Sequence, residues 1–312
     1  MPGRPRILLD CDPGHDDAVA IVAAARHADL VGITTVAGNA PLERTTHNAM
    51  VMRDLLEIDV PIHAGSGRPL VNEQQSSPAI HGTSGLDGIE LPDPTRPLDG
   101  TDAVGFIVET CRATEGVWLV PVGPLTNVAL ALRSAPDIAE RVAGISLMGG
   151  GTFGNRTPTA EYNVWADPEA AAIVFEYGGP LTMAGLDVTH RFQATPERIE
   201  RIDAIPGRLA AALGHLMRFF SGTYLERHEP GALGGAAMHD PLAVLAVTHP
   251  QLFTSVQRHV SIELTGTLTR GMTVIDRRTL RDRPAPNCAV LTDLDTDVGF
   301  DLLVDAVAHF SR

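Results

Sequence analysis

The sequence contains few cysteines, and their positions argue against a zinc site. Cys11, Cys111 and Cys288 lie far apart and match no zinc-binding spacing. We therefore expect three reduced, mostly buried thiols, as in a cytosolic protein. The first residues, MPGRPR, lack the apolar core of a secretory signal, and no apolar run is long enough to span a bilayer. We expect a cytoplasmic protein that does not enter a membrane.

Positive charge is also scarce. The chain has 24 Lys and Arg residues against 38 Asp and Glu residues, and its formal net charge is −14. Nucleic acids and anionic membrane surfaces attract basic protein faces, so this balance argues against both as partners. A small neutral substrate remains compatible with the charge.

Two cofactor and nucleophile motifs are missing as well. There is no GxxxxGK[ST], which argues against triphosphate cofactors. There is no GxSxG, which argues against the serine nucleophile of the α/β-hydrolases. The chemistry must therefore come from other groups.

Apolar and helical patterns alternate along the 312 residues, of which 44% are hydrophobic and 20% charged. Apolar runs predict strands at 7–9, 31–36, 61–64, 117–122, 145–148 and 181–186. Helical patterns begin at 18 and at 167 and also cover 41–58, 104–114, 205–226, 241–248 and 298–308. The segments 260–264 and 272–275 are candidates for added antiparallel strands. We predict an α/β fold, an open and mostly parallel sheet flanked by helices, in a single domain covering 1–312.

Four carboxylates follow the first predicted strand within eight positions. They are Asp10, Asp12, Asp16 and Asp17 in the stretch RILLDCDPGHDDAVA. The carboxyl ends of parallel strands form the ligand-binding edge of such sheets, and clustered acids there repel one another unless a cation lies among them. Helix capping would explain Asp16 or Asp17, but it does not explain two acids at the end of an apolar strand. The pattern favours a Ca²⁺ or Mg²⁺ site, or a site for a polyol.

Polar groups also follow the other predicted strands. They are Asn39, Thr126, Asn127, a glycine triplet at 149–151, Asn155, Glu161, Asn163, His239 and Asp240. Carboxylates, amides and one imidazole suit a sugar held by its hydroxyls around a hard cation. Taken alone, Asn39 could be a turn residue, and His239 with Asp240 could be a helix cap.

The motif DCDPGHDDAVA resembles the signature of the inosine-uridine-preferring nucleoside hydrolases, which are calcium-dependent nucleoside N-ribohydrolases. The resemblance continues in the same order through TTVAGN, HGTSGLDG, PVGPLTN, LMGGG, AEYN, DPEAA, MAGLDVTH, MHDP and LTGTLTRGMTV. It covers nearly the whole chain, and the first block is the most specific. It implies hydrolysis of ribonucleosides to ribose and free base by an open α/β sheet protein, commonly a homodimer or homotetramer.

The resemblance also implies roles for individual residues. The calcium ligands would be Asp12, Asp17 and Asp240, together with the backbone carbonyl of Thr126. Asp12 would also be the base that takes a proton from a calcium-bound water. His239 would assist departure of the nucleobase, and Asp10 would support the acidic cluster. The ribose would be held by Asp16, Asn39, Glu161 and Asn163, with Asn155 as a further contact.

Some questions stay open at this point. Thr83 stands where many relatives carry Glu, and the wall at 219–237 offers Tyr224 and His228 beside a glycine-rich stretch, so the sequence does not decide between purine and pyrimidine bases. His15 and His81 have no assigned role. The closest alternative substrate is another N-riboside, such as nicotinamide riboside.

Two alternatives of other classes also remain. A non-catalytic nucleoside-binding protein would bind ribonucleosides without turnover, although Asp12 and Asp240 are costly choices for binding alone. A phosphatase of the haloacid-dehalogenase type also ends its first strand in Asp-x-Asp. That class usually carries Thr or Val where this chain has Gly14, and it needs a downstream Lys.

Overall fold

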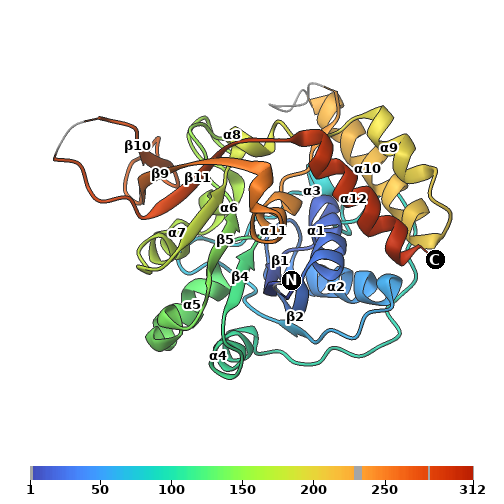
Figure 1. The fold of residues 1–312 in the computed structure, drawn as a ribbon, viewed down its shortest axis with the longest axis horizontal. Helices are drawn as coiled ribbons and strands as arrows, with labels where there is room; N and C mark the ends of the chain where they lie inside the picture. The colour runs from blue at the N-terminus through green and yellow to red at the C-terminus, as the bar shows by residue number, and fades with distance from the viewer. Residues whose placement is uncertain (1–2, 228–233, 280–281, 312) are drawn as a thin grey trace.

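The computed structural model describes residues 3–227, 234–279 and 282–311. Its centre is a nine-stranded sheet in the order β10-β9-β11-β6-β5-β4-β1-β2-β3 (Figure 1). The strands from β11 to β3 run parallel, whereas β9 pairs antiparallel with both β11 and β10. The open, mostly parallel α/β sheet predicted from the sequence is confirmed. The strands are β1 (Arg6–Cys11), β2 (Asp29–Thr35), β3 (Ile62–Ala64), β4 (Val117–Pro121), β5 (Gly144–Met148), β6 (Leu181–Ala184), β9 (Phe253–Ile262), β10 (Thr273–Asp276) and β11 (Cys288–Leu294).

Helices cover both faces of the sheet. One face packs against α1 (His15–His27), α2 (Leu42–Leu56), α10 (Arg208–Arg227), α11 (Pro241–Thr248) and α12 (Thr296–Phe310). The other packs against α4 (Ala103–Ala113), α5 (Thr126–Ser134) and α7 (Pro168–Phe175). Strand β1 serves both cores, since Ile7 and Leu9 point to the first and Leu8 to the second. This explains why β1 is a continuous apolar run rather than an alternating one.

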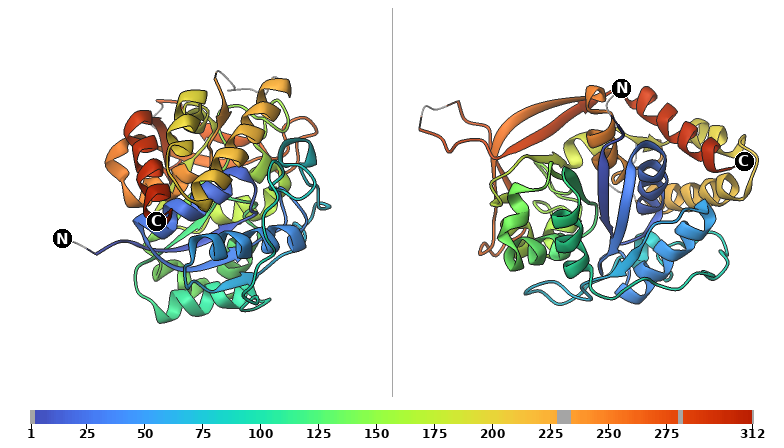
Figure 2. Two further views of the ribbon diagram at one scale, coloured as in Figure 1. Left: turned by 90° about the vertical axis from the view of Figure 1, so that its right-hand side faces the viewer. Right: turned by 60° about the horizontal axis from the view of Figure 1, so that its bottom comes forward.

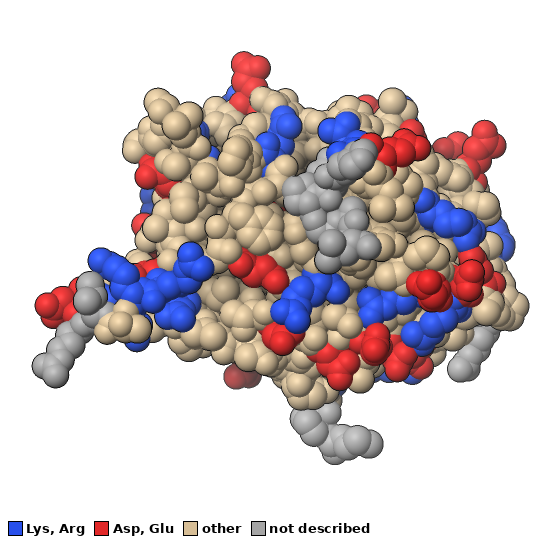
Figure 3. All heavy atoms as spheres, turned by 90° about the horizontal axis from the view of Figure 1, so that it is seen from above, with Lys and Arg blue, Asp and Glu red and all other residues tan. Residues whose placement is uncertain are grey.

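The described residues form four other α-helices. The short ones are α3 (Pro78–His81), α6 (Tyr162–Ala166) and α8 (Leu186–Thr189), and α9 (Pro196–Asp203) packs against α10 and α12. Figure 2 shows α9, α10 and α12 as a group at one side, while the β9–β10 ribbon extends from the opposite side. On the face drawn in Figure 3, acidic and basic side chains are interspersed among uncharged residues. No helix in the described part of the chain has the length and apolar character needed to cross a bilayer.

The register of the central strands brings their polar ends together. Asp10 lies opposite Thr34 of β2 and Pro121 of β4, so β1, β2 and β4 end at the same edge. The segments that follow these strands are the acidic turn, the segment around Asn39 and the start of α5. The topology therefore gathers polar residues that are distant in sequence, as predicted for a parallel sheet.

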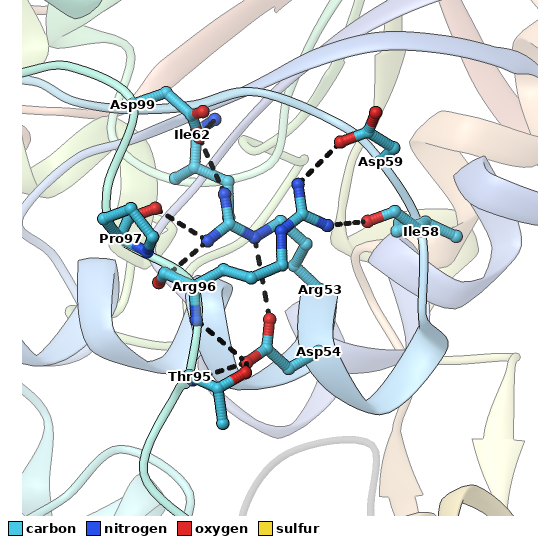
Figure 4. A network of polar contacts seen from close by, with 9 residues as sticks. All are labelled: Arg53, Asp54, Ile58, Asp59, Ile62, Thr95, Arg96, Pro97 and Asp99. Atoms are coloured by element: carbon cyan, nitrogen blue, oxygen red, sulfur yellow. Dashed lines mark hydrogen bonds and ion pairs between the residues drawn. The ribbon is translucent and has the colours of Figure 1, made fainter.

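A buried arginine fixes the far end of the long 65–100 connection. The Arg53 side chain is fully buried, and it donates to Asp99 at 2.7 Å and to the carbonyls of Arg96 and Pro97 at 3.0 and 2.8 Å (Figure 4). Asp99 also accepts from the backbone N–H of Ile62 in β3 at 2.9 Å. The network ties this end of the connection to α2 and to the sheet edge, because removing any one member would leave a buried polar group without a partner.

The structure corrects several predicted elements. The strand predicted at 181–186 ends at Ala184, because the N–H of Leu186 bonds to the carbonyl of Gly150 at 2.9 Å and α8 begins there. The sequence patterns missed α9 and β11, and they placed the start of α10 three residues early. The predicted antiparallel additions are confirmed as β9 and β10.

Candidate active site

The acidic turn connects β1 to α1 and is held by its own carboxylates. The Asp17 carboxylate accepts from the backbone N–H groups of Asp12 at 3.0 Å and Gly14 at 2.9 Å. Both contacts lie at the N-terminus of α1, where the helix dipole favours negative charge. Asp17 thus combines a capping role with a place in the site, which the sequence presented as competing explanations.

Carboxylate oxygens of Asp16, Asp17 and Asp240 lie within 4.8 Å of one another, and all three residues are buried. Burial raises the pKa of each, and the neighbouring acids raise those of Asp16 and Asp240 further; the pKa of Asp16 rises to about 7. Such a group is poorly stable as three anions without a cation. The family resemblance implies Asp12, Asp17 and Asp240 as metal ligands and Asp16 as a ribose contact, whereas the geometric cluster contains Asp16, Asp17 and Asp240.

Asp12 lies beside this cluster with one oxygen engaged and one without a partner. Its Oδ2 accepts from the backbone N–H of Asn39 at 2.7 Å. Its Oδ1 is buried and has no hydrogen-bond partner among the described residues. Burial and the charge of Asp17 raise the pKa of Asp12. A buried carboxylate oxygen without a partner indicates that a cation, a water or a substrate atom belongs there.

A second acid lies beneath the site. Asp10 Oδ1 accepts from the Thr34 hydroxyl at 2.6 Å and from the Asn127 amide at 2.8 Å. Its other oxygen is buried without a partner among the described residues, and burial raises the pKa of Asp10 to about 7. The Asn127 oxygen in turn accepts from the N–H of Ser66 at 2.9 Å. Asp10 therefore links the ends of three strands below the cluster, consistent with a supporting role.

The remaining ribose candidates lie around the same pocket. The Asn39 amide donates to Asp17 at 3.1 Å, and Glu161 accepts from the backbone N–H groups of Gly150, Asn163 and Val164. The Asn163 amide donates to the carbonyls of Val122 and Met148. Asn155 and these three residues line a cavity of about 210 Å³ together with Asp16, His239 and Asp240. The structure therefore brings all of them to one pocket.

Thr126 is buried at the start of α5, and its hydroxyl donates to Asp167 at 2.7 Å. This contact joins α5 to the N-terminus of α7, because Asp167 also accepts from the N–H of Ala170. The Thr126 side chain therefore has a structural partner, so any direct part in the site falls to its backbone.

His239 is buried, and both of its ring nitrogens have hydroxyl partners. Nδ1 lies 2.7 Å from the Thr189 hydroxyl, and Nε2 lies 2.9 Å from the Tyr224 hydroxyl. Burial, with His190 nearby, lowers the pKa of His239 to about 3, so its ring is neutral. Its backbone N–H contacts Asp16 at 3.3 Å. The contact between Tyr224 and His239 was not predicted, because the sequence pattern does not reveal how α10 lies relative to the segment before α11. His228, also considered from the sequence, lies outside the described residues.

A stack of aromatic rings lies next to the acidic turn. His15, which opens α1, stacks on His81, Phe219 and Phe220 with ring centroids 5.2–5.3 Å apart. His81, Phe220 and Tyr224 all line the pocket. The pocket is thus lined both by acids and by aromatic rings.

Acids suited to a cation and to hydroxyls, together with aromatic rings suited to a planar group, define a site for a sugar joined to a flat ring. Comparison with known proteins supports a site for a sugar joined to a flat ring. The chain belongs to the inosine-uridine preferring nucleoside hydrolase family, whose model matches residues 7–301. It is therefore a nucleoside hydrolase, an enzyme that cleaves the N-glycosidic bond of ribonucleosides.

Curated relatives include the pyrimidine-specific ribonucleoside hydrolases RihA of Escherichia coli K12 and of Shigella boydii. Each is 44% identical over 312 residues, covering 98% of this chain and 99% of the relative. Among solved structures, the purine-preferring ribonucleoside hydrolase from Gardnerella vaginalis superposes with a TM-score of 0.91 at 32% identity, covering 98% of this chain and 99% of the other. The phosphatase alternative loses its remaining support, because all 24 cationic residues are arginine and the chain contains no lysine.

Proposed function

We propose that the enzyme is calcium-dependent and that Asp12 is its catalytic base. The observation that carries this proposal is the Asp12 Oδ1 atom, buried without a described partner beside three further carboxylates. Oxygen donors only, with a large excess of negative charge, suit a hard dication such as Ca²⁺. Asp12, Asp17 and Asp240 with the Thr126 carbonyl would hold the ion, and the position of Asp16 in the cluster makes it a further candidate. When bound, the ion would position a water molecule and lower its pKa.

Asp12 is prepared to take the proton of that water. Its Oδ2 is fixed by the N–H of Asn39, so its Oδ1 is the oxygen available to accept the proton. The nearby carboxylates also favour positive charge on the ribose ring as the glycosidic bond breaks. These effects act on the water and on the sugar, and both increase as the transition state forms.

The ribose would be held between the acids and the amides. Asp16, Asn39, Asn155, Glu161 and Asn163 are the proposed contacts. Both N–H groups of the Asn163 amide are used by carbonyls, which leaves its oxygen to accept from a ribose hydroxyl. Fixing the sugar in this way contributes to rate through alignment with the water.

Departure of the base would be assisted by His239 acting through Tyr224. A neutral His239 can donate from Nε2 to the Tyr224 oxygen, so that the Tyr224 hydroxyl hydrogen points away from His239. The Tyr224 hydroxyl would then donate to the departing base. Since the pKa of His239 is lowered by burial, direct protonation of the base by a charged His239 is a poorer arrangement.

We further propose a preference for pyrimidine ribonucleosides. The support is that relatives at 44% identity over the whole chain are described as pyrimidine-specific, while the purine-preferring structural neighbour is 32% identical. A second candidate, hydrolysis of nicotinamide riboside, shares the ribose contacts and differs only at the aromatic rings. We also propose that residues 1–312 form one domain of a cytoplasmic homo-oligomer, a dimer or a tetramer.

Release of reducing sugar from uridine, cytidine, inosine, adenosine and nicotinamide riboside tests these proposals. We expect release to be fastest with the pyrimidine nucleosides, to stop on chelation and to return with Ca²⁺ better than with Mg²⁺. Release that survives removal of all divalent ions would contradict the calcium proposal. Binding of ribonucleosides without any release would support the binding-protein alternative.

Substrates lacking one hydroxyl test the ribose contacts. We expect 2′-deoxyuridine to be hydrolysed at least about a hundredfold more slowly than uridine, because alignment through sugar hydroxyls contributes several kcal/mol. Equal rates would exclude hydroxyl-dependent positioning.

A further inference from the structure

We propose that His15 is a positioning residue that holds His81 with its Nε2 nitrogen presented to the nucleoside as a hydrogen-bond acceptor. This inference rests on the proposed function, because it places a bound ribonucleoside in the pocket lined by His81. It assigns a role to the histidine of the acidic motif, which the metal and ribose contacts do not use.

The His15 ring is fixed on every side. Only 1% of the residue is exposed, and the ring stacks on Phe219 at 5.3 Å and on Phe220 at 5.2 Å. Its Nε2 lies 2.8 Å from the backbone carbonyl of Asp87, and its Nδ1 lies 3.1 Å from Nδ1 of His81. His15 thus joins the first turn of α1 to both ends of the 81–87 segment.

These contacts decide which nitrogens carry protons. The Asp87 carbonyl can only accept, so Nε2 of His15 must carry its proton. In a neutral ring, Nδ1 of His15 is then an acceptor, and the Nδ1–H of His81 donates to it. The backbone N–H of His15 also donates toward the same His81 nitrogen, at the longer distance of 3.4 Å, and this weaker contact favours the opposite assignment. The shorter contact of His15 Nε2 with the Asp87 carbonyl, at 2.8 Å, is the stronger constraint. The reverse assignment would place a lone pair against a carbonyl oxygen at 2.8 Å, which is repulsive.

The proton on Nδ1 leaves a lone pair on Nε2 of His81. That nitrogen makes no hydrogen bond to the described residues, and it is not one of the fully enclosed polar atoms without a partner. His81 lines the pocket beside Phe220, with which it stacks at 5.2 Å. The nitrogen therefore accepts from a donor on the substrate. A ribonucleoside offers two such donors near the aromatic rings, an N–H of the base and the 5′-hydroxyl.

A purely structural role would predict a different result from the proposed one. If His15 only filled space, a ring of the same size would replace it without changing substrate affinity. If it fixes the His81 proton, the replacement must also offer an acceptor opposite Nδ1 of His81. His15→Phe keeps the stacked ring and removes both nitrogens, whereas His15→Asn supplies an amide oxygen that can accept from His81. His27→Phe, at the other end of α1, is the matched control.

The experiment measures kcat and KM for uridine, 3-methyluridine and 5′-deoxyuridine. With uridine, we expect His15→Phe to raise KM about five- to tenfold with kcat little changed, since one neutral hydrogen bond is lost. We expect His15→Asn to recover part of this loss and His27→Phe to show none. The analogue that lacks the donor should bind weakly to wild type and lose nothing more in His15→Phe. Circular dichroism and thermal unfolding establish that each variant is folded.

A spectroscopic readout separates this proposal from the enzymatic one. The measurement is NMR of the ring nitrogens in protein labelled with ¹⁵N-histidine, with His81→Gln used to assign the His81 signals. We expect His81 to carry its proton on Nδ1 in wild type and mainly on Nε2 in His15→Phe. A wild-type His81 protonated on Nε2 would overturn the proposal, and so would a wild-type KM in folded His15→Phe. The nitrogen shifts keep this meaning even if no ribose is released, an outcome that would refute only the proposed function.

Discussion

Asp12→Asn should remove most turnover while leaving the fold intact. Asparagine is close in shape to aspartate, and its amide oxygen can still accept from the N–H of Asn39, which now bonds to Asp12 Oδ2 at 2.7 Å. The amide nitrogen then occupies the Oδ1 position, which makes no hydrogen bond to a described residue. The substitution therefore removes the proton acceptor without leaving a broken contact. Loss of a general base costs about 10²- to 10⁴-fold in kcat, or about 3 to 5 kcal/mol in the barrier.

The assay is steady-state release of ribose from uridine at saturating calcium, with nucleoside binding to the variant measured by calorimetry. A second expected result has the opposite sign. The metal-free variant should unfold at a higher temperature than the metal-free wild type. The reason is that it lacks the buried Asp12 carboxylate beside those of Asp16, Asp17 and Asp240. Wild-type kcat in a variant shown to bind calcium would refute the assignment of Asp12 as the base. A lower unfolding temperature without metal would refute the electrostatic account of the cluster.

Three further predictions address other parts of the molecule. Tyr224→Phe should lower kcat for uridine about 10- to 100-fold but leave 4-nitrophenyl riboside hydrolysis nearly unchanged, since that leaving group needs no proton; equal losses for both would contradict a donor role. The pKa of Asp10 is raised from 3.8 to about 7. The stabilisation that protonated Asp10 gives to the metal-free protein should therefore be complete below about pH 4 and be lost as the pH rises through 7. Asp10→Asn should reduce this fall in the free energy of unfolding, measured by chemical denaturation. Arg53→Met should lower the free energy of unfolding, measured by chemical denaturation, by about 2–4 kcal/mol, because Asp99 and two carbonyls lose a buried partner. The control Arg96→Met, at a half-exposed position, should lower it by about 1 kcal/mol.

Much of the central sheet was predictable, because it depends on local patterns. Strand β1 is apolar on both faces, and the turn chemistry after it marks the start of α1. The positions of polar residues at strand ends then followed from the topology, which brings Asn39, Asn163 and Asp240 to one pocket. The strand β11 was missed because its sequence, CAVLTDL, is neither a continuous apolar run nor a regular alternation of apolar and polar residues.

Contacts between distant side chains could not be predicted in the same way. The pairing of His15 with His81, of Tyr224 with His239 and of Arg53 with Asp99 depends on how helices and loops pack, and no periodicity encodes it. Arg53 illustrates the difficulty, since an arginine in a helix is expected at the surface and this one is fully buried. The alternative explanations of the acidic motif as cap or as site also turned out not to exclude each other.

The acidic site also constrains the order in which the protein can fold. The backbone N–H of His239 reaches Asp16 across 223 positions of the chain, and α11 packs directly on α1. During synthesis, the acids of the N-terminal turn must therefore wait until Asp240 has left the ribosome before their cluster can form. Contacts of such long range form slowly, and metal affinity is coupled to them. Binding of the proposed calcium ion would consequently be acquired only late in synthesis, after most of the chain has been made.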